Sequence, residues 1–152
     1  MTSMVKKFKT YPAAFFSKEE RERIVRAIRE AEQETSGEIC VYLERKARGD
    51  LLAHAKRVFE KIGMTKTEKR NGVLIYLSLR DRAFAILGDK GIHEKVGDGF
   101  WQGIVEVLQE RFSKNDFAAG LESGIHKIAE KLKTHFPWKP GDKNELPDRI
   151  RE

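Results

Sequence analysis

A glycine-rich segment at residues 88–99 carries the carboxylates Asp89, Glu94 and Asp98. Ca²⁺ and Mg²⁺ prefer carboxylate and carbonyl oxygens, and glycines leave backbone carbonyls accessible. We expect Glu38, from the same edge of a predicted sheet, to complete the ligand set. The segment therefore predicts a divalent-cation site, for Ca²⁺ first and Mg²⁺ second, although it lacks the alternating acidic spacing of an EF-hand. The structural alternative is that the glycines form turns and Asp98 caps the next helix.

A second polar group contains Asp50 and Asp81 with the arginines Arg80 and Arg82. Phosphoryl transfer needs cations on the phosphate oxygens and an activated nucleophile, so this group predicts an alternative metal or phosphate site. Ligands of open α/β sheets tend to bind beyond the carboxyl ends of the parallel strands, which favours this position. The structural alternative is an exposed hairpin tip with ordinary surface ion pairs.

Histidine and cysteine chemistry is disfavoured. No two of the four histidines have metal-ligand spacing, and His54 lies within a predicted helix. The single cysteine, Cys40, lies in the middle of a predicted strand without a phosphate-binding glycine loop after it, so we expect it to be buried and inert.

The elements that must position these residues follow from hydrophobic periodicity. Ser17 and Glu20 form a predicted capping box that begins the first helix. The predicted order is helix (17–34), strand (38–43), helix (50–63), strand (72–79), strand (83–87) and two helices (100–112 and 116–136). A strand–helix–strand unit predicts parallel pairing with a right-handed crossover, and the tight turn at Arg80 and Asp81 adds an antiparallel strand. The predicted fold class is α/β, a three-layer α/β/α sandwich with a small mixed sheet.

This topology divides the candidate residues between two edges of the sheet. Glu38, Asn71 and Asp89 lie at the edge where the parallel strands begin, whereas Asp50 and the 80–82 turn lie at the opposite edge. The two candidate sites are therefore rivals.

The chain has 152 residues, which fits one domain. We expect an N-terminal extension at 1–16, the folded domain at 17–136 and a C-terminal tail at 137–152. The longest apolar run, residues 72–77, is too short to span a membrane, and the absence of a signal-peptide core predicts a soluble, cytoplasmic protein.

The net charge of +6 is concentrated in residues 45–70. A basic face can bind phosphate backbones, but no nucleic-acid motif or aromatic interleaving accompanies it. We expect a solvated face, with a protein partner on this face or on the tail as the alternative.

Several ordered motifs resemble the TPM domain family. They are Thr35-Ser36-Gly37-Glu38-Ile39, Arg70-Asn71-Gly72-Val73-Leu74-Ile75, Asp81-Arg82, Gly88-Asp89-Lys90-Gly91 and Asn115-Asp116-Phe117 with Gly120-Leu121. Phe100-Trp101, Phe136-Pro137-Trp138 and Asn144-Glu145-Leu146-Pro147 are similar to a soluble bacterial branch of that family. The resemblance implies an α/β/α sandwich, calcium or another divalent ion in some members, and acid-phosphatase activity in plant members.

The leading hypothesis is a divalent-cation-binding domain with a binding or regulatory role. The alternatives are a metal-assisted acid phosphatase acting on phosphomonoesters, and a protein-interaction module without metal.

Overall fold

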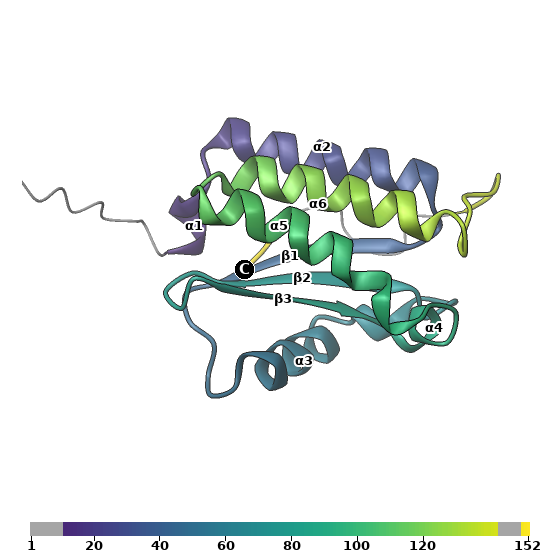
Figure 1. The fold of residues 1–152 in the computed structure, drawn as a ribbon, viewed down its shortest axis with the longest axis horizontal. Coiled ribbons are helices and arrows are strands. Elements are labelled where there is room, and N and C mark those ends of the chain that lie inside the picture. The colour runs from purple at the N-terminus through teal and green to yellow at the C-terminus, as the bar shows by residue number, and fades with distance from the viewer. Residues whose placement is uncertain (1–10, 143–149) are drawn as a thin grey trace, which may run out of the picture.

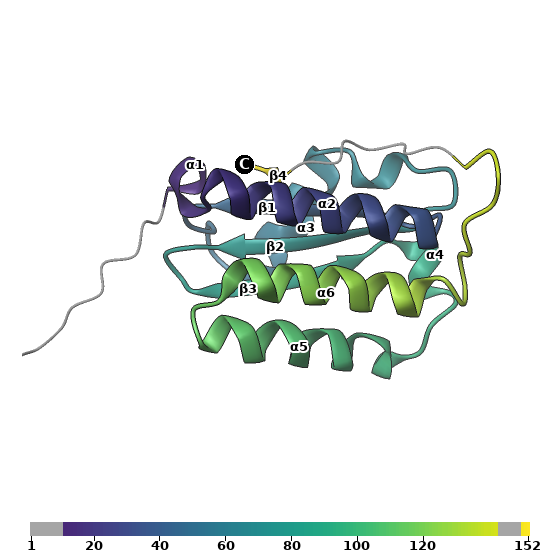
Figure 2. The same ribbon diagram turned by 90° about the horizontal axis from the view of Figure 1, so that it is seen from above.

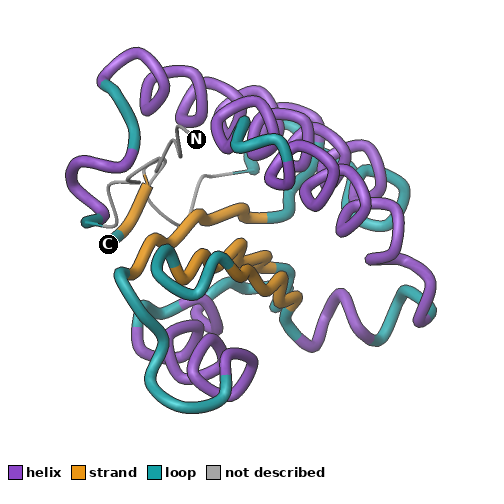
Figure 3. Tube along the Cα trace, turned by 60° about the vertical axis from the view of Figure 1, so that its left-hand side comes forward, coloured by secondary structure: helices purple, strands orange, loops and turns teal. Residues whose placement is uncertain are grey.

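The computed structural model describes residues 11–142 and 150–152. The elements along the chain are α1 (Pro12–Phe15), α2 (Lys18–Glu34), β1 (Glu38–Glu44), α3 (Leu51–Lys61), η1 (Met64–Lys66), β2 (Gly72–Ser78), β3 (Ala83–Gly88), α4 (Lys90–His93), η2 (Asp98–Trp101), α5 (Gln102–Ser113), α6 (Phe117–Leu132) and β4 (Ile150–Arg151). Figure 1 shows the sheet between a layer of α2, α5 and α6 and a layer formed by α3. The same three layers are visible in Figure 3, and they confirm the predicted α/β/α sandwich.

The sheet is mixed, with the strand order β3-β2-β1-β4. β1 and β2 pair in parallel with Glu38 opposite Gly72, and β3 pairs antiparallel to β2. Ile150 and Arg151 add a parallel strand beside β1, opposite Val41 and Tyr42. The sequence analysis did not predict β4, because two residues are too few to show an alternating pattern.

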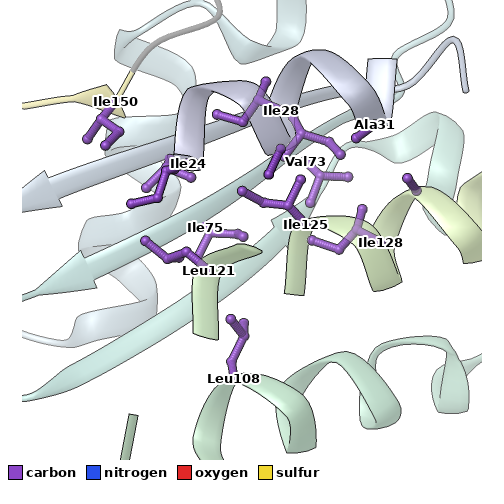
Figure 4. Close-up of a cluster of buried hydrophobic side chains, with 14 of the residues drawn as sticks. Ile24, Ile28, Ala31, Val73, Ile75, Leu108, Leu121, Ile125, Ile128 and Ile150 are labelled. Carbon is purple, nitrogen blue, oxygen red and sulfur yellow. The ribbon is translucent and has the colours of Figure 1, made fainter. Parts of the chain in front are cut away.

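The four long helices, α2, α3, α5 and α6, lie where hydrophobic periodicity predicted them, because each buries one apolar stripe. The capping box at the start of α2 is present, with the Glu20 amide donating to the Ser17 hydroxyl and the Ser17 amide donating to Glu20. α2 and α6 pack on one face of the sheet, as Figure 4 shows for Ile24, Ile28 and Ile125. A second apolar cluster lies under α3 and includes Leu74 and Phe59.

The glycine-rich segment is more ordered than the predicted loop. α4 follows β3 directly, and η2 then leads into α5. The carboxylate of Asp89 caps α4 by accepting a hydrogen bond from the Lys90 amide, at 2.8 Å. Part of the segment therefore has a structural role, but the residue that caps a helix is Asp89, whereas the alternative interpretation expected Asp98; the N-cap of η2 is Gly97.

None of the helices among the described residues is long and apolar enough to cross a membrane.

Candidate functional site

The edge of the sheet where β1 and β2 begin and β3 ends is called the α4 end here. The Glu38 amide donates to the Asn71 carbonyl at 3.3 Å, and the Asp89 amide donates to the Gly72 carbonyl at 2.9 Å. These backbone bonds place Glu38, Asn71 and Asp89 side by side, as the sequence predicted. Figure 2 shows that the C-terminal part of α2 and the segment after α6 lie at the same end of the molecule as α4.

Buried polar side chains gather at the α4 end. Of the buried polar residues among those that the structure describes, Ser78 is at the opposite end, and the others are Thr35, Glu38, Thr67, Asn71 and Asp89. Burying a carboxylate or an amide costs free energy unless it gains partners. The side-chain oxygen of Asn71, a residue only 1% exposed, makes no hydrogen bond with the described residues. Thr35, Thr67 and Asp89 have hydrogen-bond partners at this end, so the Asn71 side-chain oxygen is the group there whose burial the described contacts leave uncompensated.

A small cavity of about 40 Å³ opens beside Glu38. Carboxylates from three separate segments line it: Glu32 from the last turns of α2, Glu38 from β1 and Asp142 from the segment after α6. Ser36 and Trp138 line it as well. Glu38 is only 2% exposed, so its carboxylate lies in the protein interior beside this cavity.

Asp89 is held by Arg70. The guanidinium donates to both carboxylate oxygens, through Nε at 2.6 Å and Nη2 at 2.8 Å. The hydrogen bond from Arg70 to the Asp89 carboxylate raises the pKa of the guanidinium. With the Lys90 amide as a third donor, Asp89 is satisfied without a metal ion.

Local backbone geometry explains why Arg70 can reach Asp89. Arg70 has a φ of +51°, which turns the chain immediately before β2. Its carbonyl accepts a hydrogen bond from the Gly91 amide at 2.9 Å. A Cβ on Gly91 would collide with the carbonyl oxygens of Lys69 and Arg70, so only glycine allows α4 to pack against this turn.

Of the other predicted ligands, Glu94 is exposed at the end of α4 and does not line the cavity. Asp98 begins η2, and its side chain lies outside what the structure describes. Within residues 11–142 and 150–152, no three His, Cys, Asp or Glu side chains converge closely enough to hold a metal ion as they stand. Any ion at the α4 end would have to draw the carboxylates of the cavity together.

The opposite edge is called the hairpin end here, because β2 and β3 are joined there. Asp50 is exposed and caps α3 by accepting from the Ala53 amide at 2.9 Å. Asp81 accepts from the Ser78 hydroxyl at 2.7 Å, and that hydroxyl accepts from the Ala47 amide at 3.0 Å. Both carboxylates predicted for a metal or phosphate site therefore hold their own segments in place.

Both arginines of this alternative site are exposed. The Arg80 amide donates to the Arg45 carbonyl at 2.8 Å. Arg82 has a φ of +50° and lines a second cavity on the α5–α6 side of the sheet.

A third polar cluster was not predicted. Glu44 at the end of β1 contacts the His54 Nε2 at 2.5 Å and accepts from the Tyr76 hydroxyl at 2.6 Å. Burial, and then the hydrogen bond to Glu44, raises the pKa of Tyr76 well above its ordinary value. Neither of the two cavities described here is lined by these residues. The sequence analysis disfavoured histidine chemistry and did not foresee these contacts of His54, whose side chain is mostly covered.

The sequence analysis missed Glu32 and Asp142 as members of the α4 end. Glu32 lies three residues before Thr35, and Thr35 begins the first motif that resembles the TPM family. Because that motif includes Glu38, the proximity of Glu32 to Glu38 could have been inferred. Asp142 gives no such signal, because its position depends on how the chain turns after α6.

Comparisons with known proteins agree with this fold. The family model of the TPM domain matches residues 10–131. The chain is similar to the BA42 protein of the psychrophilic bacterium Bizionia argentinensis, with 42% identity, a TM-score of 0.89, and coverage of 94% of this chain and 99% of that one. It also shares its fold with the N-terminal domain of a P. gingivalis protein, at 21% identity and a TM-score of 0.65, over 82% of this chain and 81% of the other. No curated protein matches the chain.

Proposed function

The chain belongs to the TPM domain family, and from this premise we propose that it binds a divalent cation at the α4 end. The ligands are carboxylate oxygens of Glu32, Glu38 and Asp142, which line the cavity of about 40 Å³. The role that we propose is binding or regulation, because the proposal rests on ligand oxygens and not on a nucleophile or a general base.

One observation carries the proposal: three carboxylates from distant segments line one small cavity, and Glu38 among them is buried. A divalent cation that drew these carboxylates together would offset the repulsion between their like charges. A bound cation would also join α2, β1 and the segment after α6. These segments are far apart in sequence, so binding should stabilise the fold.

The size of the cavity favours Ca²⁺ over Mg²⁺. One water needs roughly 10–15 Å³ of such space, so about 40 Å³ admits an ion with a few waters at most. Mg²⁺ releases its waters reluctantly and demands near-octahedral geometry, whereas Ca²⁺ accepts six to eight oxygens in irregular arrangements. The side-chain oxygen of Asn71 lies at the same end of the sheet, but Asn71 is not among the residues that line the cavity.

Asp89 has a different role in this proposal from the one that its sequence position suggested. Its carboxylate keeps the Arg70 guanidinium and the Lys90 amide as partners. It thereby fixes α4 against the start of β2, beside the cation site. Glu94 and Asp98 receive no role in binding.

Thermal unfolding tests the proposal directly. The protein is melted in EDTA, in Ca²⁺ and in Mg²⁺ at matched ionic strength. A ligand at 100 times its Kd adds about 2.7 kcal/mol, which raises the Tm of a domain of this size by roughly 5–10 °C. We expect a rise of this order in Ca²⁺ and a smaller one in Mg²⁺.

Two glutamates of α2 provide the matched pair of variants. Glu32 is half-buried beside the cavity, whereas Glu34 is exposed at the end of the same helix. The Glu32→Gln variant should lose most of the rise in Tm, and Glu34→Gln should keep it. No rise in wild-type protein, or equal rises in the two variants, would contradict the proposal.

A further inference from the structure

The hairpin end contains a much larger cavity, of about 540 Å³. It is bounded by α1, the β2–β3 hairpin, and the end of α5 with the start of α6, elements that lie at one end of the molecule in Figures 1 and 2. Cavities of roughly 300–1,000 Å³ are typical of small-molecule sites. The volume of this cavity lies within that range.

Phenylalanine rings form the walls of the cavity. Phe15, Phe84, Phe112 and Phe117 line it, and their rings contact one another edge-on or tilted, with centroids 5.1–5.3 Å apart. These edge contacts hold the rings in place, so the cavity does not require a ligand to form its walls. The walls suit an apolar body, either an acyl chain or an aromatic ring system.

The polar side of the cavity has a single charge. Gln109, Ser113 and Asn115 contribute amide and hydroxyl groups, and of the described residues that line the cavity Arg82 alone is charged. A guanidinium suits a carboxylate, phosphate or sulfonate, which it can bind through two parallel hydrogen bonds.

The backbone of Arg82 supplies a second, independent observation. Its φ of +50° lies in the left-handed region, which glycine and asparagine adopt far more readily than arginine. Residues held in such conformations cluster at functional sites. Asn115, which also lines the cavity, has a φ of +61°. A turn that would be less strained with glycine therefore places an arginine at the cavity.

We propose that this cavity binds a small amphiphile with one anionic head group, its apolar body between the phenylalanine rings and its head on Arg82. This site is separate from the cation site, and the two inferences stand or fall independently.

Fluorescent probes with and without a charge test this inference. 1-Anilinonaphthalene-8-sulfonate carries an anionic head, and N-phenyl-1-naphthylamine has the same kind of apolar body without it. We expect one equivalent of each to bind to the native protein with enhanced, blue-shifted emission. Dodecanoate and 2-naphthoate are then tested as competitors that displace the bound probe. Displacement by dodecanoate assigns an acyl chain as the apolar body of the ligand, and displacement by 2-naphthoate assigns an aromatic ring system. If neither compound displaces the probe, the proposal is overturned.

The Arg82→Gly variant separates binding from folding. It removes the guanidinium and relieves the left-handed backbone, and its Tm, measured beside that of the wild-type protein, shows that the variant folds. Its affinity for the sulfonate probe should fall about tenfold, with the affinity for the neutral probe unchanged. The Ser113→Trp variant, which places a large side chain at the exposed margin of the cavity, should weaken both probes. An unchanged affinity of Arg82→Gly for the sulfonate probe, or probe binding that Ser113→Trp leaves intact, would overturn the proposal.

Discussion

The two ends of the sheet differ in the burial of their carboxylates and in the size of their cavities. At the α4 end, Glu38 and Asp89 are buried and the cavity beside Glu38 measures about 40 Å³. At the hairpin end, Asp50 and Asp81 are exposed, whereas the cavity beside Arg82 measures about 540 Å³ and has phenylalanine walls. The α4 end therefore suits a small cation, and the hairpin end suits a larger apolar ligand.

The difference shows that the number of acidic residues is a poor guide to a site. Both ends collect carboxylates from distant segments, but those of the hairpin end cap a helix or support a turn in water. A carboxylate becomes informative when burial makes it costly, because some partner must then offset the cost. For that reason we propose the cation site at the α4 end, beside the buried Glu38.

The largest effect on stability is expected at Gly91, with Gly97 of the same segment as the control. Gly91→Ala should destabilise the protein by about 3 kcal/mol, because its Cβ would collide with backbone oxygens that cannot move aside. Gly97→Ala, in the same segment but with no atom within 4 Å of its Cβ, should change stability by less than about 0.5 kcal/mol. Urea denaturation measures both. Equal values would show that α4 does not pack against the turn before β2 as described.

An intermediate effect is expected for Asp89 compared with Asp81. Asp89→Asn leaves the Arg70 guanidinium without its carboxylate, and since water still reaches that guanidinium the cost should be about 2 kcal/mol. Asp81→Asn removes an exposed charge and should cost about 0.5 kcal/mol. Urea denaturation at pH 7 tests the order. If Asp81→Asn proves the more costly, the Arg70–Asp89 pair does not hold α4 as described.

A smaller effect is expected for Tyr76 at the carboxyl end of β2. Burial and its bond to Glu44 raise the pKa of Tyr76 above the ordinary value of 10.0, so the folded state keeps a proton that the unfolded state loses. Stability should therefore fall as the pH rises above 10, by up to about 1.4 kcal/mol per pH unit from this group.

The Tyr76→Phe variant tests that dependence. The substitution should lower the free energy of unfolding by about 1 kcal/mol at pH 7, because the hydrogen bond to Glu44 is lost. The stability of the variant should also fall less steeply than that of the wild-type protein above pH 10. Urea denaturation of both proteins between pH 7 and pH 11 measures the difference. Parallel curves would mean that Tyr76 titrates alike in the folded and unfolded states.

Much of the fold could be predicted because its signals are local. The capping box at Ser17 and the apolar stripe of α2 follow from a few neighbouring residues, and the parallel β1–β2 pair follows from the helix between them. That topology also placed Glu38 and Asp89 at one edge, where the structure has them. β4 could not be predicted, because its position depends on pairing with β1 and not on its own sequence.

The sites were harder to predict because they depend on packing. Arg70 belongs to a basic run, and nothing in that run shows that its guanidinium holds Asp89. Asp142 lines the small cavity because of the path that the chain takes after α6. Tyr76 contacts His54 because of the face of β2 on which it lies. A cavity is a property of the packed side chains, so neither cavity could be inferred from spacing.

The most direct test is a calorimetric titration of Ca²⁺ into two variants, one from each end. Asn retains the backbone hydrogen bonds that Asp142 and Asp50 accept, so both Asp142→Asn and Asp50→Asn should fold. Placement of the cation at the α4 end predicts that Asp142→Asn binds Ca²⁺ at least about tenfold more weakly than wild-type protein, and that Asp50→Asn binds it equally well. Weakened binding in Asp50→Asn with full affinity in Asp142→Asn would contradict the assignment and move the cation site to the hairpin end.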